Sequence, residues 1–277
     1  MTQPKIPATN TNPRMYVISD VHNQLGALQR LLEKIPEEAK LIYVGDLVHK
    51  GPVEDCERLV DFVKSQVDSG RAICISGNHD STVGKGKGRT QEGTLRDDQR
   101  EWLRSLPLFI RKDGLVYVHG GMYNSTSKVL RTLIETGYLP KEGDWTPELV
   151  EQALRSVSRK NLKTLGNMRY VRFVDSDTGK MVSFGHEKPT DVYWATKYDG
   201  EFGTVVFGHN PWVMGPAMFA HALGIDSGAG VSEFEPTHPF SVGAMVPTIS
   251  YGKGLMAVPV NNGVVDVGAV QWVEVQA

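Results

Sequence analysis

The sequence predicts an α/β protein whose central sheet is covered on both faces. In the first half of the chain, short apolar runs alternate with segments in which apolar residues recur at helical spacing. The short runs are apolar at nearly every position, which is typical of strands buried on both faces, and their alternation with helices is typical of α/β domains. With 277 residues, 40% of them hydrophobic, the chain is long enough to bury a large core.

Five strands are expected, at residues 15–18, 41–44, 72–75, 115–118 and 205–207. A helix is expected after each of the first three, and the third of these helices lies around residues 97–106. The other two are marked by apolar side chains at helical spacing, namely Leu25, Leu28, Leu32 and Ile35, and then Cys56, Leu59, Val60 and Val63.

A single domain is expected over residues 14–277, preceded by a flexible tail at residues 1–13. Residues 122–203 are expected to form a mostly helical insertion, and residues 228–252 a loop without a clear period. The chain ends in a predicted hairpin that turns at Asn261-Asn262-Gly263, because Asn-Gly suits a two-residue hairpin turn.

The composition is that of an ordinary soluble protein, with 22% charged residues and a formal net charge of −2. This balance gives no global attraction to nucleic acid or to membranes, so neither is expected as a partner. The two cysteines, Cys56 and Cys74, lie in apolar stretches and cannot form a disulfide framework, which favours a cytoplasmic location. No signal peptide or membrane span is recognised.

Every expected strand is followed by side chains that can bind metal ions. In chain order these are Asp20 and His22, Asp46, Asn78 and His79, His119, and His209. Each of them alone is more often a turn residue or a structural partner. The carboxyl ends of strands in an open α/β sheet meet where the loops converge, however, so five strand ends that all carry such side chains predict one metal site.

The ligand types indicate which metals the site would hold. Carboxylate, imidazole and amide ligands without a thiolate favour Mn²⁺, iron or Zn²⁺, and Mg²⁺ at lower affinity. Six candidate ligands are too many for a closed structural zinc site, which takes four. They suit two metal ions about 3.5–4 Å apart, bridged by Asp46. Two divalent ions are therefore expected as cofactors, with Mn²⁺ first and iron, zinc, nickel or magnesium as alternatives.

The ordered motifs D-x-H, GD, GNHD, VHGG and GH, across residues 15–210, resemble those of the calcineurin-like metallophosphoesterases. The most similar branch contains the Ser/Thr protein phosphatases and the symmetrical diadenosine tetraphosphatases. The resemblance implies a central β-sandwich flanked by helices (an αββα fold), with a dinuclear metal centre at the C-terminal ends of the strands and His79 as the general acid. It implies one metal ion on Asp20, His22 and Asp46, and the other on Asp46, Asn78, His119 and His209.

Two motifs depart from the family pattern. Gly208-His209-Asn210-Pro211 lacks the second His of the G-H-x-H motif found in many phosphodiesterases and nucleases. In place of G-D-x-V-D-R-G the chain has Gly45-Asp46-Leu47-Val48-His49-Lys50-Gly51. The Asp that orients the catalytic His in the family is therefore missing. Lys50 replaces an Arg that binds phosphate, and it keeps the positive charge but cannot donate two parallel hydrogen bonds as Arg does.

The stretch "GDLVHKGP" and the "NMRY" at residues 167–170 resemble the diadenosine tetraphosphatase-like phosphatases more than the protein phosphatases. Arg169 is therefore a candidate second phosphate ligand beside Lys50, with an ordinary surface Arg as the alternative. The resemblance implies hydrolysis of phosphate esters or anhydrides by metal-activated hydroxide. In this reaction His79 protonates the leaving oxygen, and the side chains of Lys50 and Arg169 stabilise the equatorial oxygens of the phosphate.

A diadenosine tetraphosphatase-like hydrolase is the function expected first, acting on nucleoside polyphosphates or other phosphorylated small molecules. A Ser/Thr or broad-specificity protein phosphatase, acting on phosphoproteins, is the alternative within the same chemistry. A metal-binding scaffold with little turnover is a third hypothesis, which the retained His79 and the complete ligand set oppose. A nuclease is least favoured, because the GHNP motif lacks the extra His and no phosphate-tracking basic stripe is evident.

Other residues near the motifs have plainer expected roles. Gly77 is expected to let the chain turn sharply before Asn78, and Asp80 to have a turn or capping role. His49 is expected to be a loop residue near the site, with substrate contact as the alternative. The remaining histidines are expected to be structural or exposed, namely His186, His221 and His238.

Two further features leave alternatives open. The loop from Gly84 to Arg89, rich in Gly and Lys, is expected to be mobile and solvated, although it could bind an anionic substrate. It resembles neither a P-loop nor a dinucleotide fingerprint. Trp194 and Tyr198 in the insertion could stack on a base or anchor the insertion to the core.

Overall fold

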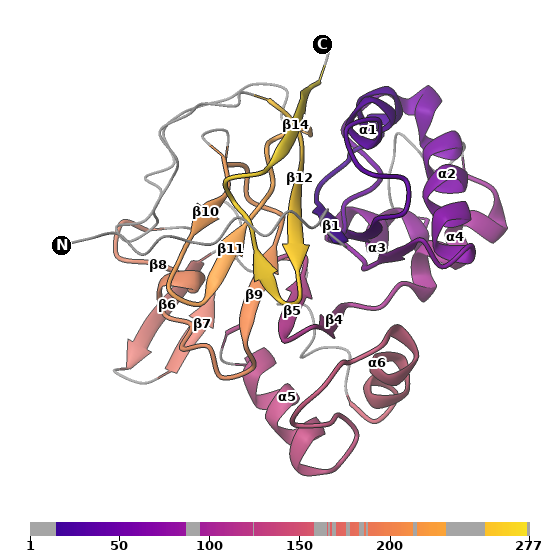
Figure 1. Cartoon of the computed structure of the whole chain (residues 1–277). Helices are drawn as coiled ribbons and strands as arrows, with labels where there is room; N and C mark the ends of the chain where they lie inside the picture. Colours follow the sequence, from indigo (N-terminus) through magenta and orange to yellow (C-terminus); the bar gives the residue numbers. More distant parts are fainter. Residues whose placement is uncertain are drawn as a thin grey trace.

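The structure, a computed structural model, contains two central β-sheets with helices on either side (Figure 1). It describes residues 15–86, 95–123, 125–157, 170–175, 178–182, 188–212, 215–230 and 253–275, together with residues 165, 167 and 186. The expected N-terminal tail and most of the expected loop at residues 228–252 lie outside these ranges. Five of the strands lie where apolar runs predict them, at β1, β2, β3, β5 and β9.

The first sheet has a parallel half and an antiparallel half. Its parallel strands are β1 (Met15–Ile18), β2 (Lys40–Tyr43) and β3 (Ala72–Cys74). The C-terminal strand β12 (Gly254–Asn261) pairs antiparallel with β1, and β13 (Val264–Val265) and β14 (Gln271–Glu274) pair with β12. The pairing of β12 with β1 therefore places the first and the last described segments of the chain side by side.

The second sheet repeats this arrangement. Its parallel strands are β5 (Leu115–Val118), β9 (Thr204–Phe207) and β11 (Ala222–Gly224), and its antiparallel edges are β4 (Phe109–Lys112) and β10 (Ala217–Met218). The sequence predicts five strands as one ordered set, whereas the structure divides them between two sheets. The β-sandwich implied by the family resemblance is thereby confirmed.

Three apolar clusters separate four layers of structure. The cluster between the sheets is formed by one face of each sheet and includes Val17, Ile42, Tyr117, Val206 and Val258. A second cluster covers the outer face of the first sheet with α1 (Leu25–Leu32), α2 (Cys56–Asp68) and α4 (Asp97–Ser105). A third covers the outer face of the second sheet with α5 (Ser125–Glu135) and α6 (Pro147–Leu154). Strands of both sheets are thus buried on both faces, as their continuous apolar runs predict.

Short segments complete the connections between these elements. The 3₁₀-helix η1 (Val53–Asp55) leads into α2, and α3 (Asn78–Gly84) follows β3 and lies against α4. Helix α6 begins at residues that favour a helix start, since the Thr146 hydroxyl accepts a hydrogen bond from the Leu149 amide and Pro147 stands in its first turn.

The segment at residues 122–203 contains more than the expected helices. Besides α5 and α6 it carries a small sheet of β6 (Tyr170–Asp175), β7 (Thr178–Met181) and β8 (Val192–Tyr193), which the sequence does not predict, and the 3₁₀-helix η3 (Trp194–Thr196). Trp194 and Tyr198 are 0% and 5% exposed and pack in the third cluster, Trp194 with its ring 4.9 Å from that of Phe207. The two alternatives for these rings were stacking on a base and anchoring the insertion to the core, and their burial shows that they anchor the insertion.

The predicted C-terminal hairpin is confirmed. Val260 pairs with Val265 and Asn261 with Val264, which leaves Asn262 and Gly263 as a two-residue turn. Both turn residues have positive φ, 48° and 76°, as a type I′ turn requires. The second arm is interrupted after β13 and rejoins β12 as β14, so the hairpin is longer and less regular than a simple two-strand unit.

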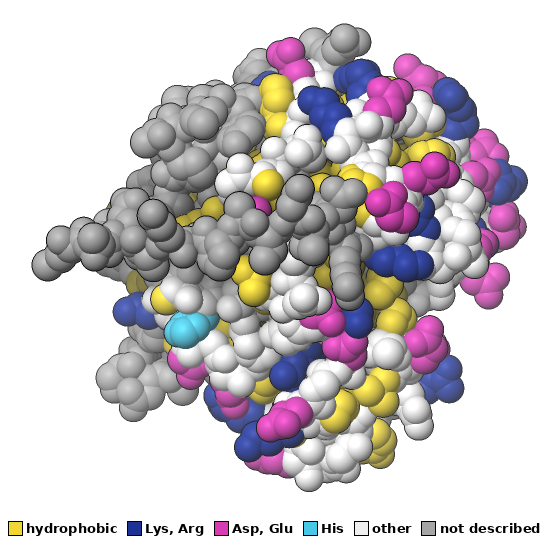
Figure 2. Space-filling model, viewed as in Figure 1, with side chains coloured by type: hydrophobic (Ala, Val, Ile, Leu, Met, Phe, Trp, Pro, Cys, Tyr) yellow, Lys and Arg dark blue, Asp and Glu magenta, His cyan; other side chains and the backbone are white. Residues whose placement is uncertain are grey.

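The described surface is mixed in charge. Acidic and basic side chains are interspersed over the helical face that Figure 2 shows, without a stripe of one sign. Within the described ranges, no helix combines the length and apolar character needed to cross a bilayer.

Substitution of Ile42 tests the packing of the apolar core between the two sheets. Its side chain is 1% exposed on β2, inside the cluster between the sheets. We expect Ile42→Ala to lower the free energy of unfolding by about 3 kcal/mol and Ile42→Val by about 1 kcal/mol, because the cavity left behind grows with the number of methyl groups removed. Urea unfolding of the metal-free protein measures both values. A cost of the Ala variant below that of the Val variant would contradict this packing.

Candidate metal centre

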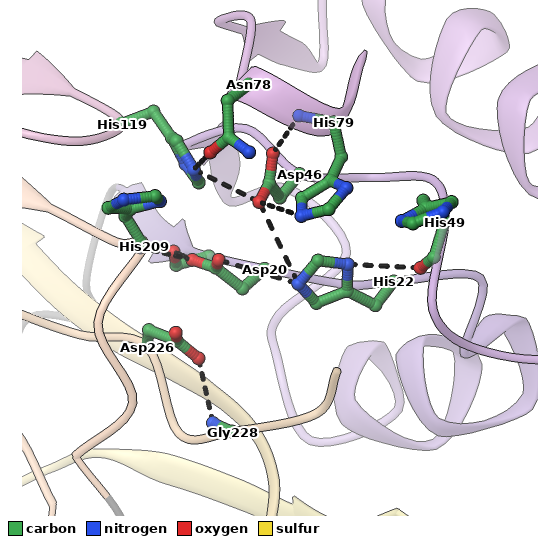
Figure 3. Close-up of polar contacts among 12 residues, drawn as sticks. Asp20, His22, Asp46, His49, Asn78, His79, His119, His209, Asp226 and Gly228 are labelled. Carbon is green, nitrogen blue, oxygen red and sulfur yellow. Dashed lines mark hydrogen bonds and ion pairs between the residues drawn. The ribbon is translucent and has the colours of Figure 1, made fainter. Parts of the chain in front are cut away.

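The predicted strand-end residues come together in one cluster (Figure 3). They stand in the loops that leave β1, β2, β5 and β9 and at the start of α3, so both sheets supply side chains. The parallel strands of each sheet point their carboxyl ends at this edge. The members are Asp20, His22, Asp46, Asn78, His79, His119 and His209.

Asp46 occupies the centre of the cluster. Its Oδ2 lies 3.1 Å from Nε2 of His119, 3.8 Å from Nε2 of His22 and 3.9 Å from Nε2 of His79. Its Oδ1 accepts a hydrogen bond of 2.9 Å from the His79 amide. Asp46 is 1% exposed, so all of these contacts are made away from water.

Two groups of side chains around Asp46 have the geometry of metal ligands. Asp20, His22 and Asp46 form one group, and Asp46, His119 and His209 form the other. Within each group the ligand atoms lie within 4.8 Å of one another, and Asp46 belongs to both. The family resemblance implies this division, and the ligand types predict a shared Asp46. Asn78, an amide, joins the second group through its Oδ1, 3.1 Å from Nε2 of His119.

The tautomers of two histidines suit metal binding. The Nδ1 of His119 lies 2.9 Å from the carbonyl oxygen of Val44, and that of His22 lies 3.1 Å from the carbonyl oxygen of His49. A carbonyl oxygen only accepts, so each Nδ1 carries the proton and donates it. Such a hydrogen bond fixes the ring and turns Nε2 toward the cluster, which is the usual arrangement behind a metal-binding imidazole.

The donor set around His119 fits a cation. Its Nε2 faces two oxygen acceptors, Oδ2 of Asp46 and Oδ1 of Asn78, each 3.1 Å away. Because Nδ1 of His119 already carries one proton, its neutral ring has a lone pair on Nε2. That lone pair faces the lone pairs of the two oxygens, which is unfavourable unless a proton or a metal ion lies among the three atoms. The buried carboxylates, imidazoles and amide together form a set that suits Mn²⁺, iron or Zn²⁺.

Burial and mutual charge shift the pKa values in this cluster in opposite directions. Burial and the neighbouring carboxylates of Asp226 and Asp46 raise the pKa of Asp20 well above its usual range. Burial lowers the pKa of His119, but the carboxylates of Asp46 and Asp20 outweigh it and raise that pKa to about 10. Burial alone would also raise the pKa of Asp46, and the imidazoles of His119, His22 and His79 outweigh it, so that pKa lies well below its usual range.

The loops that carry these residues hold strained backbone. Nine non-glycine residues among those described have positive φ, and seven of them stand in the loops of this cluster: Asp20, His22, Asn23, Asp46, His49, Lys50 and His209. Asn, Asp and His adopt this region more readily than other residues, yet each instance costs on the order of 1 kcal/mol or more. Such strain concentrated at one place is typical of a functional site.

Asp80 ties two of these loops together, which confirms its predicted capping role. Its Oδ1 accepts the amides of Leu47 and Val48 at 2.9 and 3.2 Å, and its Oδ2 accepts the amide of Gly77 at 2.9 Å. The carboxylate is fully buried. The loop after β2, which carries Asp46, is thereby fixed against the start of α3.

The predicted reason for Gly77 is wrong. Its φ of −86° and ψ of 178° are extended and open to any residue, so no sharp turn requires glycine. A Cβ at this position would instead lie 2.1 Å from Oδ1 of Asp46. Gly77 is therefore needed for the close approach of Asp46 to the chain that presents Asn78 and His79.

His79 is held by ring contacts. Its ring stacks on that of His49, with centroids 4.6 Å apart and planes 19° apart, and meets the edge of His22 at 5.3 Å. Burial lowers the pKa of His79 to about 4. His49, expected to be a loop residue near the site, thus lies within it and covers one face of His79.

The remaining predicted residues differ in where they lie. Lys50 is exposed at the rim, and its charge lowers the pKa of His22 and of His79. Arg169 lies outside the described residues, as do His238 and the end of the Gly84–Arg89 loop. His186 and His221 are exposed and do not belong to either ligand group.

Asp226 is a further acidic residue of the centre, not predicted from the sequence. It follows β11, is 4% exposed, and accepts a hydrogen bond of 2.8 Å from the Gly228 amide through Oδ1 (Figure 3). Burial raises its pKa to about 6. The signal was present, since the apolar run Ala222–Ile225 is followed by an Asp as β1 and β2 are, but the run is short and lies after the last recognised motif.

Comparison with known proteins agrees with this site. Residues 13–213 match the calcineurin-like phosphoesterase family, and the chain belongs to it. The chain is 26% identical over 249 residues to the symmetrical bis(5'-nucleosyl)-tetraphosphatase of Janthinobacterium sp. (strain Marseille), covering 77% of this chain and 88% of that protein. It is 37% identical over 124 residues to the enzyme of the same name from Marinomonas sp. (strain MWYL1), covering 39% of this chain and 44% of that one.

A solved structure shares the fold. The crystal structure of a candidate diadenosine tetraphosphatase matches with a TM-score of 0.57 at 22% identity, covering 93% of each chain. The predicted family, fold class and enzyme class are therefore confirmed: the chain is a hydrolase of phosphate esters or anhydrides.

Asp80 provides a test of how the centre is held. We expect Asp80→Ala to lower the free energy of unfolding by about 3 kcal/mol or more, because three buried amides lose their acceptor. Asp80→Asn keeps an oxygen for Leu47 and Val48 and should cost about half as much. Urea unfolding measures both, with the exposed Asp68→Ala as a control. Equal stability of Asp80→Ala and wild type would contradict the role given to this carboxylate.

Proposed function

We propose that the protein is a dinuclear metal-dependent hydrolase of dinucleoside polyphosphates, which cleaves a phosphate anhydride of diadenosine tetraphosphate to give two ADP. The observation that carries the proposal is the pair of ligand groups that share Asp46. The names of the relatives supply the substrate class, since both are symmetrical bis(5'-nucleosyl)-tetraphosphatases. Cys56 and Cys74 are buried and form no disulfide, which supports a reducing, cytoplasmic setting.

The residues that would hold the two metal ions follow from the two groups. Asp20, His22 and Asp46 would bind one ion, and Asp46, Asn78, His119 and His209 the other. Bound there, two divalent ions, Mn²⁺ first, would lower the pKa of a water molecule and screen the negative charge of the phosphate. The carbonyl oxygens of Val44 and His49 would keep His119 and His22 in the ligand tautomer.

His79 would act as the general acid. It belongs to neither ligand group, is partly exposed, and lies 3.9 Å from Asp46, so its Nε2 is close to the centre and still open to a substrate. Burial disfavours its charged form, and an incoming phosphate anion would favour that form again. The stacked ring of His49 takes the orienting place of the missing Asp, by packing rather than by a carboxylate.

The cations at the rim would bind the substrate. The exposed ammonium of Lys50 is placed to attract the equatorial phosphate oxygens as a point charge. Arg169 remains a second proposed phosphate ligand from its motif alone. The ring of His49 and the hydrogen bonds of Asp80 would preorganise these groups before the substrate arrives.

The acid role of His79 predicts a dependence on the leaving group. We expect His79→Ala to reduce the turnover of phenyl phosphate by about 10²–10⁴-fold and that of p-nitrophenyl phosphate far less, because nitrophenolate leaves readily without a proton. The metal content, measured by elemental analysis, should be unchanged because His79 is outside both ligand groups. Equal losses on the two substrates would show that His79 does not donate the proton.

The substrate class is tested by direct competition. Metal-stripped protein reconstituted with Mn²⁺ is given diadenosine tetraphosphate and a phosphothreonine peptide together, and the products are separated by chromatography. We expect ADP to form faster than inorganic phosphate. Faster release of phosphate from the peptide would make the protein a phosphoprotein phosphatase, and hydrolysis of neither would support the metal-binding scaffold.

A further inference from the structure

A cavity lies where residues of α3 and α4 meet the end of α6, and one of its lining residues, Ser76, precedes Gly77 in the chain. Its volume is about 520 Å³. It is lined on one side by residues of α3 and of the chain just before it, on another by the end of α4 and the segment that follows, and on the third by the end of α6. The charged side chains among them are Lys85, Arg104, Glu151 and Arg155.

Two residues that line the cavity, Ser81 in α3 and Lys85 directly after it, share a helical face with Asn78. Asn78, Ser81 and Lys85 are three and then four residues apart, and residues at this spacing lie on one face of a helix. At 1.5 Å per residue, Lys85 lies about 10 Å along the helix from Asn78. Ser76 and Ser81 also bracket Asn78 and His79 in the chain. A long substrate held at the metal centre could therefore extend into this cavity.

Two cations in the cavity lack an acidic partner among the described residues. Nζ of Lys85 donates to Oγ of Ser81 at 3.0 Å, and the Arg104 guanidinium donates to the carbonyl oxygen of Gly84 at 2.6 Å. Neither forms an ion pair with a described carboxylate, whereas Arg155, the third cation, pairs with Glu151 at 2.7 Å. Two positive charges without a described acidic partner, one of them hydrogen-bonded to a serine hydroxyl, form a site for a phosphate-bearing group.

The other walls of the cavity are apolar. Leu103 and Leu106 are buried, and Leu108, Leu154 and Val157 are half-buried along its sides. A pocket that combines an apolar wall with a few polar groups is the usual form of a site for a small organic ligand. Cations at the end near α3 and leucines behind them match a nucleotide, whose phosphates are anionic and whose base is flat and weakly polar.

We infer that this cavity is a subsite for the distal nucleoside diphosphate half of the substrate, which leaves as ADP. Lys85 and Arg104 would bind its phosphates, and the leucine wall would contact its base. The inference rests on the proposed function. It adds a reason for the selectivity of the enzyme for dinucleoside polyphosphates, because a small phosphate monoester contacts the metal centre and does not extend into the cavity. It also gives Lys85, at the start of the loop rich in Gly and Lys, a role in binding an anionic substrate.

The test is the double variant Lys85→Ala/Arg104→Ala assayed on two substrates. For diadenosine tetraphosphate we expect KM to rise about 10- to 100-fold with kcat within about twofold, because loss of one charged contact weakens binding about tenfold. For p-nitrophenyl phosphate both constants should equal those of wild type, which also shows that the variant is folded. Arg58→Ala/Lys64→Ala, at two cations of α2 that do not line the cavity, makes the same change of charge elsewhere and should leave both substrates unaffected.

The outcomes separate this inference from the proposed function. If wild type hydrolyses diadenosine tetraphosphate and the double variant has the same KM, the subsite is wrong and the proposed function stands. If wild type hydrolyses only p-nitrophenyl phosphate, both are wrong. ADP as an inhibitor gives a second readout: it should compete with diadenosine tetraphosphate in wild type and weaken about tenfold in the variant, whereas purely non-competitive inhibition would indicate a regulatory nucleotide site and overturn the subsite.

Discussion

The structure depends on one buried carboxylate. Asp46 is 1% exposed and lies among three imidazoles, those of His119, His22 and His79, which together hold its pKa well below the usual range. A charge buried without such partners would cost several kcal/mol, so these neighbours are needed for Asp46 to be ionised at all. His22 follows β1 in the first sheet and His119 follows β5 in the second. The contacts of Asp46 therefore join the two sheets at the edge where the substrate would bind.

The rest of the fold holds Asp46 in this place. The apolar core between the sheets sets their separation, and parallel strands within each sheet bring their carboxyl ends to one side. Asp80 then fixes the loop after β2 to α3, and the absence of a side chain at Gly77 lets that loop approach. The strained backbone of seven residues in these loops persists because the surrounding hydrogen bonds and packing over-determine it.

The sequence predicts the members of the centre better than their arrangement. Asp20, Asp46, Asn78 and His119 are recognisable because each follows an apolar strand, a signal that is local in the chain. The division of strands between two sheets is not local, since a strand buried on both faces has the same pattern in one sheet as in two. That distinction came from the family resemblance.

Other features depend on residues that are distant in the chain. His49 stacks on His79 from a loop in which His49 and Lys50 both have positive φ, and no residue pattern predicts such a loop. The need for glycine at position 77 comes from Asp46, 31 residues earlier, and not from its own backbone angles. Asp226 was missed because it follows β11, beyond the last recognised motif, and the small sheet β6–β8 because it interrupts a helical segment.

The central claim is that Asp46 bridges two metal ions, and electron paramagnetic resonance of the metal-stripped protein during addition of Mn²⁺ tests it most directly. We expect two equivalents of Mn²⁺ to bind per chain and the spectrum at saturation to be that of two exchange-coupled ions, as a shared carboxylate requires. Binding of a single Mn²⁺ per chain, or of two ions whose spectra are those of isolated Mn²⁺, would contradict it.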